Sequence, residues 1–175
     1  RIMYTSDPCA FERTWFTAQD KVGDLFIVCG MGIYPNLDTA DGYAIVVCRG
    51  KLTYVRYHRR LGLNRMDMRF GPLNWEIIVP FKTWKLTLGD NPNGIRYELN
   101  WHDTKRPVFS EGRPALSTAV APNGGFGDRV GYEGFGVIEG WVEVSGERFE
   151  LSPVTFNGSR DHHWGVRRGV GGIGA

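Results

Sequence analysis

The sequence lacks the common motifs of hydrolases and nucleotide-binding enzymes. It contains no G-x-S-x-G turn, no H-E-x-x-H motif and no phosphate-binding loop of the G-x-x-x-x-G-K-[ST] type. One G-x-G-x-x-G string occurs at residues 169–174. A dinucleotide fingerprint, however, needs a strand before it and a helix after it, and the sequence predicts no helix. We therefore reject it and expect no cofactor.

Cysteine is scarce, and no segment is apolar enough to form a membrane helix. Cys9, Cys29 and Cys48 are an odd count without C-x-x-C spacing, and the last two lie in apolar runs. That usage is typical of reduced thiols and favours a reducing compartment. Because no run approaches ~18 apolar residues, we expect a cytoplasmic protein without a transmembrane segment. The alternative is one that reaches a lipophilic substrate at a membrane surface.

Charge of one sign is not concentrated anywhere in the chain. Its 21 Lys and Arg residues and 19 Asp and Glu residues give a net charge of +2. The densest basic run, residues 56–60, stands alone, so we interpret it as a solvated strand end rather than a phosphate-binding patch. No nucleic-acid partner is expected.

Aromatic residues and short alternating segments are abundant. The 175 residues include six Trp, seven Tyr and ten Phe. Period-two segments separated by Gly, Pro, Asn and Asp predict about ten antiparallel strands and an all-β fold, either a barrel or a sandwich. The predicted strands are Glu12–Gln19, Asp24–Tyr34, Gly42–Arg49, Lys51–Arg59, Arg65–Phe70, Trp75–Val79, Thr83–Leu88, Ile95–His102, Tyr132–Val144 and Arg148–Phe156.

Two further features depart from simple alternation. Residues 104–128 are rich in Pro and Gly and predict a long loop, either a lid or an excursion between strands. Beyond it, glycines at positions 131, 134, 136 and 140 surround Tyr132 and Glu133. They either turn a barrel corner or let a ligand approach the backbone, in which case Tyr132 and Glu133 line a cavity. The four residues Trp75, Trp84, Trp101 and Trp141 are expected in the core.

The only concentration of chemically useful side chains is at residues 158–167, G-S-R-D-H-H-W-G-V-R. In an extended strand, Asp161 and His163 share one face, while Arg160, His162 and Trp164 share the other. A desolvated Asp161 beside an indole is a candidate general acid, with a histidine as base or orienting group. Alternatively, an Arg stacked on Trp and paired with Asp closes a barrel end.

No metal site is predicted from the histidines. His162 and His163 are adjacent, so in a strand they point to opposite faces and cannot easily bind one ion. His58 and His102 are not at ligand spacing, and the cysteines are distant in sequence.

The 158–167 run, preceded by G-Y-E-G-F-G at 131–136, resembles the lipocalin-like (calycin-type) family of hydroxyneurosporene synthase, the carotenoid hydratases. Bacterial relatives with an R-D-H-S-W-G-x-R motif are most similar, and this chain has His163 where they have Ser. The resemblance implies an antiparallel lipocalin-like barrel or strongly curved sheet over residues 1–168. Residues 169–175 would then be a linker or the entry to a second module of the same chain, with the ligand near the junction.

The resemblance also implies residue roles and an activity. Asp161, His162 and Trp164 would be catalytic at the polar end of a cavity, and Arg160, His163, Arg167, Tyr132 and Glu133 would bind. The implied reaction is cofactor-independent hydration or isomerisation of an apolar, alkene-bearing molecule of the isoprenoid type. Asp161 would protonate the double bond and His162 would position water. Two alternatives remain: a non-catalytic module that binds lipophilic ligands, and a structural half of a two-module protein.

Overall fold

The computed structural model describes residues 6–110 and 129–166 and consists almost entirely of antiparallel strands. One 3-10 turn, η1, spans Pro35–Leu37. The strands are β1 (Ala10–Asp20), β2 (Leu25–Tyr34), β3 (Thr39–Cys48), β4 (Lys51–Arg60), β5 (Arg69–Phe70), β6 (Leu73–Val79), β7 (Thr83–Leu88), β8 (Ile95–Asp103), β9 (Val108–Ser110), β10 (Arg129–Val144), β11 (Glu147–Leu151) and β12 (Phe156–Val166). Among these residues, none forms a helix of the length and apolarity that a membrane crossing requires.

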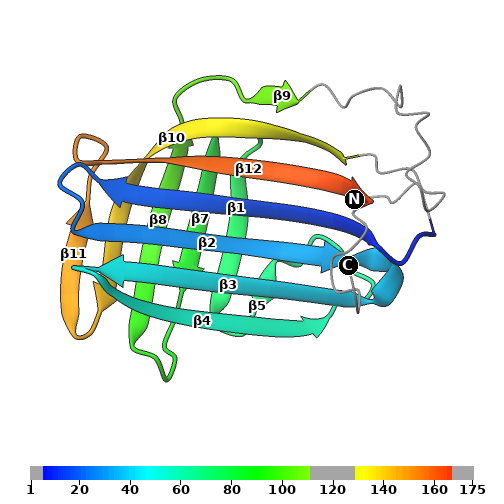
Figure 1. Cartoon of the computed structure of the whole chain (residues 1–175), viewed down its shortest axis with the longest axis horizontal. Helices are drawn as coiled ribbons and strands as arrows, with labels where there is room; N and C mark the ends of the chain where they lie inside the picture. Colours follow the sequence, from blue (N-terminus) through cyan, green and yellow to red (C-terminus); the bar gives the residue numbers. More distant parts are fainter. Residues whose placement is uncertain (1–5, 111–128, 167–175) are drawn as a thin grey trace.

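All strands belong to one strongly curved sheet, as expected for a lipocalin-like barrel. The order is β4-β3-β2-β1-β12-β10-β8-β7-β6-β5, and β9 and β11 each pair with β10. In Figure 1, β4, β3, β2, β1 and β12 run side by side as one layer, with β7 and β8 crossing behind them. The two layers enclose the core, so the sheet forms a nearly closed barrel. The all-β prediction is confirmed.

Strand β10 joins the two layers because it is long and bends. Its first half pairs with β12 and its second half with β8. Gly140, with φ +125°, allows the bend, because a Cβ there would lie 2.1 Å from the carbonyl oxygen of Glu98. At Gly136 a Cβ would lie 2.5 Å from the indole of Trp101. Two of the β10 glycines therefore serve strand curvature and close side-chain packing.

Side chains draw the two ends of the sheet together. The guanidinium of Arg59, near the end of β4, donates to the carbonyl oxygen of Arg69 in β5 at 2.7 Å. It also lies over the Phe70 ring, 5.0 Å from its centroid. Phe70 in turn packs edge-on against Trp75. These contacts close the barrel where β4 and β5 do not share a ladder.

The interior is filled with aromatic side chains. Trp84 and Trp101 both pack edge-to-face against Phe16, with centroid distances of 5.3 and 5.4 Å. Trp75 is also buried, so the core assignment of these three tryptophans is confirmed. Trp141 is only partly buried and lies under Arg148, so its assignment to the core was wrong. The three buried tryptophans and Phe16 belong to one cluster of buried residues between the layers.

Several strand boundaries differ from the predicted ones for local reasons. The predicted strand at 65–70 is wrong, because an Asn64–Asp67 turn precedes the two-residue β5. The predicted strand at 148–156 is divided by a Ser152–Thr155 turn, so residues 158–166 lie in a strand of their own. The predicted 104–128 loop contains β9, which pairs with β10. Residues 111–128 lie outside the described residues, as do 167–175.

Stability should fall at alkaline pH partly because of the buried thiol of Cys29. Burial raises the pKa of this thiol to about 12, whereas in the unfolded chain a thiol ionises near ~8.5. The contribution of the protonated Cys29 thiol to the free energy of unfolding is therefore complete below about pH 8.5 and is lost as the pH rises toward 12. Denaturant titrations from pH 7 to 10.5 should show a smaller loss of unfolding free energy for Cys29→Ala than for the unmodified chain. If the unfolding free energies of Cys29→Ala and the unmodified chain fall equally with pH, this role of Cys29 is contradicted.

Candidate functional site

Strand β12 carries the predicted cluster and lies between β1 and β10. Phe16 and Gly134 oppose Arg160, while Trp15 and Glu133 oppose Asp161. Because strand side chains alternate, Arg160 and His162 face the inside with Phe16. Asp161 and His163 face the outside with Trp15. The predicted division of these side chains between two faces is confirmed, and it places the cluster on both sides of one sheet.

On the inner face, Arg160 forms a buried ion pair with Asp103 at the end of β8. Its Nε and Nη2 atoms donate to the two carboxylate oxygens at 2.9 and 2.7 Å. The indole Nε1 of Trp101 donates to the same carboxylate at 3.0 Å. The guanidinium lies 5.8 Å from the Trp84 centroid and 5.0 Å from that of Tyr132. Arg160 does lie over a tryptophan and pair with an aspartate, but its partner is Asp103 rather than Asp161.

Two residues further along β12, on the same face, His162 bridges two polar side chains. Its Nε2 lies 2.8 Å from Oε1 of Glu12 in β1, and its Nδ1 lies 3.0 Å from the hydroxyl of Tyr132 in β10. Burial raises the pKa of the Tyr132 hydroxyl, although the Arg160 guanidinium opposes the rise. Tyr132 therefore keeps its proton at neutral pH. We call Glu12, His162 and Tyr132 the inner relay.

Aromatic rings surround the inner relay. Trp164 packs edge-on against His162 with centroids 5.4 Å apart. Phe81 and Phe109 both pack against Tyr132, at 5.4 and 5.3 Å, and both are about half exposed. Phe81 has φ +58°, an unusual backbone conformation for a bulky residue. Strain of this kind is often found at ligand sites. The relay thus lies at an apolar rim that solvent reaches.

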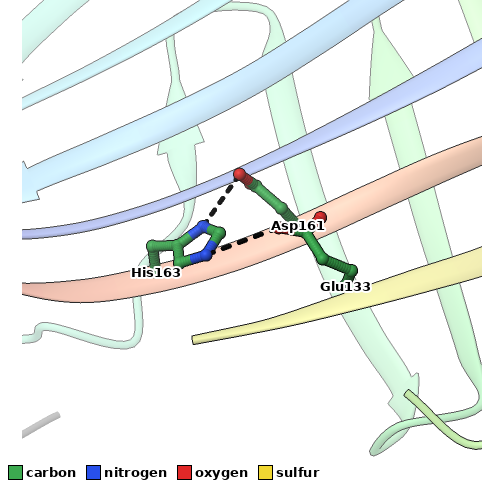
Figure 2. A group of neighbouring side chains, drawn as sticks. All are labelled: Glu133, Asp161 and His163. Atoms are coloured by element: carbon green, nitrogen blue, oxygen red, sulfur yellow. Dashed lines mark hydrogen bonds and ion pairs between the residues drawn. The ribbon is translucent and has the colours of Figure 1, made fainter. Parts of the chain in front are cut away.

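On the outer face, Asp161 and His163 form a second polar group with Glu133 of β10. His163 Nδ1 lies 2.9 Å from Oδ2 of Asp161, and its Nε2 lies 3.4 Å from Oε1 of Glu133. Figure 2 shows these two contacts as dashed lines from the ring nitrogens of His163. Asp161 also accepts the backbone N–H of Trp15 at 3.2 Å. Asp161 and His163 are buried, and Glu133 is about half exposed.

The structure therefore brings the predicted site residues together in two groups. Arg160, His162, Trp164 and Tyr132 share the inner face, and Asp161, His163 and Glu133 share the outer face. Asp161 and His162, predicted to act on one molecule, point to opposite sides of the sheet. Arg167 lies outside the described residues.

Sequence reasoning missed two residues of the inner face, Glu12 and Asp103. They are 150 and 57 positions from the residues that they contact. Only strand pairing brings them there, since β1 and β10 flank β12 and β8 pairs with the second half of β10. Glu12 stands alone at a predicted strand start and Asp103 alone after a predicted strand end, so no local sequence pattern marks either residue as part of a site.

The outer face also carries a hollow beside the Asp161 group. It has a volume of about 380 Å³ and is lined by aromatic and charged side chains of β1 to β4, including Trp15, Tyr34, Tyr43, Arg13 and Arg56. Burial raises the pKa of the Tyr43 hydroxyl to about 12, so it stays protonated. The volume lies within the range of small-molecule sites.

The fold matches solved structures at low sequence identity. A protein provisionally assigned as AttH from Nitrosomonas europaea has a TM-score of 0.63 and 14% identity, over 90% of this chain and 52% of its own. Kievitone hydratase from Nectria haematococca has a TM-score of 0.59 and 15% identity, and the match covers 89% of this chain and 48% of that protein. CghA with Sch210972 has a TM-score of 0.57 and 14% identity, and the match covers 90% of this chain and 46% of that protein. This chain thus spans about half the length of these proteins.

These similarities support the predicted resemblance at the level of the fold alone. Identities of 14–15% carry no residue roles, so the roles assigned to the 158–167 motif stay predictions. No curated protein sequence matches this chain. A family model matches residues 2–174, nearly the whole sequence, and it is described as a family of unknown function, DUF8625. The chain belongs to this DUF8625 family.

Proposed function

We propose that this chain is a hydratase-like barrel module that adds water to, or isomerises, an apolar alkene of the isoprenoid type at its inner relay. The proposal rests chiefly on the bridge that His162 forms between Glu12 and Tyr132. A carboxylate, an imidazole and a phenol in one hydrogen-bonded row can hold and move a proton. The name of kievitone hydratase, whose barrel is similar, supports hydration as the reaction class.

The acid in this mechanism is His162, whose Nε2 lies 2.8 Å from Oε1 of Glu12. It transfers its proton to one alkene carbon, which leaves a cation on the other. The oxygen of a water molecule then forms a bond to the cationic carbon. The proton that this water loses returns to His162, so the net change is addition of one water. In an isomerisation, His162 instead removes a proton from a neighbouring carbon.

The apolar rim around the inner relay suits a carbocation intermediate. Trp164, Phe81 and Phe109 present ring faces and apolar edges near Tyr132 and His162. Ring faces attract cations electrostatically, and apolar surfaces hold the hydrocarbon. Tyr132, which keeps its proton, orients His162 through Nδ1. In this proposal the proton donor is His162 rather than Asp161, because Asp161 lies across the sheet from the rim.

The test is turnover by the purified protein, with isoprenoid and prenylated alkenes as substrates. His162→Gln should lower kcat by about 10²–10⁴-fold, the usual contribution of a positioned acid or base, while ligand binding persists. Asp161→Asn and His102→Gln, the latter an exposed control on β8, should leave kcat within a few-fold. Loss of kcat with Asp161→Asn but not with His162→Gln would contradict the inner relay and favour Asp161.

A non-catalytic binding module is the second candidate, and the outer hollow favours it. Its aromatic lining beside Arg13 and Arg56 fits a lipophilic molecule that carries a polar group. If this candidate is correct, no alkene is converted, and Trp15→Ala weakens ligand binding whereas His162→Gln does not. Fluorescence titration of the two variants separates the two candidates.

A further inference from the structure

We propose that Glu133, Asp161 and His163 form a site for a divalent transition metal, zinc in the first instance, on the outer face of the sheet. The site lies on the other side of β12 from the inner relay and does not depend on the proposed reaction. Among the described residues, these three are the group whose potential ligand atoms all lie within 4.8 Å of one another. Figure 2 shows the three side chains, with the carboxylates of Asp161 and Glu133 each linked to a different ring nitrogen of His163.

The buried carboxylate sets the tautomer of the imidazole. An ionised carboxylate only accepts hydrogen bonds, so Nδ1 of His163 donates to Oδ2 of Asp161 across 2.9 Å. In the neutral ring, Nε2 then carries the lone pair. That lone pair lies 3.4 Å from Oε1 of Glu133, also a lone-pair donor. Two such atoms face each other favourably only with a cation between them, either a proton or a metal ion.

The distance between these two atoms suits a metal ion. Zinc binds imidazole nitrogen and carboxylate oxygen at about 2.0–2.1 Å with tetrahedral geometry, which separates two ligand atoms by about 3.3–3.4 Å. The separation between Nε2 and Oε1 is 3.4 Å. A mixed nitrogen and oxygen ligand pair favours zinc or a similar transition metal over magnesium or calcium.

The residues around the pair resemble the outer shell of a metal site. Metal-binding histidines usually donate their second ring N–H to a carboxylate, which fixes the ring. Asp161 does so here, and it is itself held by the N–H of Trp15. The absence of a side chain at Gly131 makes room for the ring, because a Cβ there would lie 2.1 Å from Cδ2 of His163. Glu133 is half exposed, so an ion can enter and water can complete its coordination.

The chain contains a natural control in the pair His102 and Glu139. Their Nε2 and Oε1 atoms lie 3.2 Å apart, as close as in the proposed site. Both side chains are exposed, and the pair does not belong to a group of three potential ligands among the described residues. If proximity of one His and one Glu sufficed, both pairs would bind zinc. If the buried carboxylate of Asp161 is required, only the pair of His163 and Glu133 will bind zinc.

Isothermal titration of ZnCl2 into the EDTA-treated, full-length protein tests the site. A Cys9→Ser and Cys48→Ser background removes the two partly exposed thiols. We expect saturable binding that falls at least tenfold in Glu133→Gln and His163→Ala, and about 10–100-fold in Asp161→Asn, as for other carboxylates behind a metal ligand. His102→Ala should leave the affinity unchanged. Near-ultraviolet circular dichroism reports whether each variant is folded, and Glu133→Gln, at a half-exposed position, keeps the test valid if His163→Ala unfolds.

Three results would overturn the metal site. The first is the absence of zinc binding at concentrations up to about 1 mM, a threshold that corresponds to weak affinity. The second is zinc binding that survives both Glu133→Gln and His163→Ala. The third is zinc binding that His102→Ala removes. The result is separable from the proposed function, because zinc binding is measured without substrate and His162→Gln should not change it.

Discussion

Replacement of Asp103 by Ala is expected to lower the free energy of unfolding by about 3–5 kcal/mol. The carboxylate is almost completely buried, with 2% of its side chain exposed, and Arg160 is 0% exposed. Removing the carboxylate leaves the guanidinium buried without its countercharge and takes the acceptor from the Trp101 indole. Urea unfolding followed by tryptophan fluorescence measures the loss.

Two controls isolate the effect of the unpaired charge. Glu147→Ala breaks the bidentate pair between Arg49 and Glu147, whose side chains are 58% and 48% exposed, and should cost far less than Asp103→Ala because solvent screens the pair. The double replacement of Arg160 by Met and Asp103 by Leu removes both charges and should recover most of the stability. A small effect of Asp103→Ala, comparable to that of Glu147→Ala, would mean that water reaches the pair.

Replacement of Trp101 by Ala is the second large effect, about 3–5 kcal/mol of destabilisation. The indole is 0% exposed, packs edge-on against Phe16, and lies against Gly136. Its removal leaves a cavity that the surrounding strands can only partly close, and one hydrogen bond to Asp103 is lost. The same urea titration, read by far-ultraviolet circular dichroism, measures the change without depending on tryptophan emission.

Trp141 is the matched control for Trp101. It lies on the same sheet but is partly exposed, and its main contact is the guanidinium of Arg148 at 4.2 Å. Trp141→Ala should therefore cost much less than Trp101→Ala. Equal costs would contradict the assignment of Trp101 to the core. Because Trp101 and Asp103 share a hydrogen bond, the costs of their two replacements should not add.

Much of the fold could be predicted from local patterns. Alternation identified the strands of the β2–β3–β4 and β7–β8 regions closely, and β7 matches its predicted bounds. The reason is that one face of each strand is buried, so polarity repeats every second residue. The same periodicity correctly assigned Asp161 and His163 to one face of their strand and His162 and Trp164 to the other. It could not show which face was the interior.

Elements that depend on turns or on distant pairing were less predictable. The Ser152–Thr155 turn that separates β11 from β12 has no glycine or asparagine, but it contains Pro153, a turn signal that the predicted strand at 148–156 overlooked. Strand β9 has three residues and gains its structure from pairing with β10 rather than from its own pattern. For β9 the decisive interactions lie outside the segment, whereas the turn is held by local hydrogen bonds to Ser152.

The sequence by itself determined most of the strands, the aromatic composition of the core and the concentration of polar side chains at residues 158–167. Tertiary structure alone decided their partners: Asp103 for Arg160, Glu12 for His162, and Glu133 for His163. The physical reason is that a strand's alternation depends on local burial, whereas cross-strand contacts depend on register and sheet order. Here β1, from the start of the chain, and β10 flank β12. No local pattern encodes that adjacency.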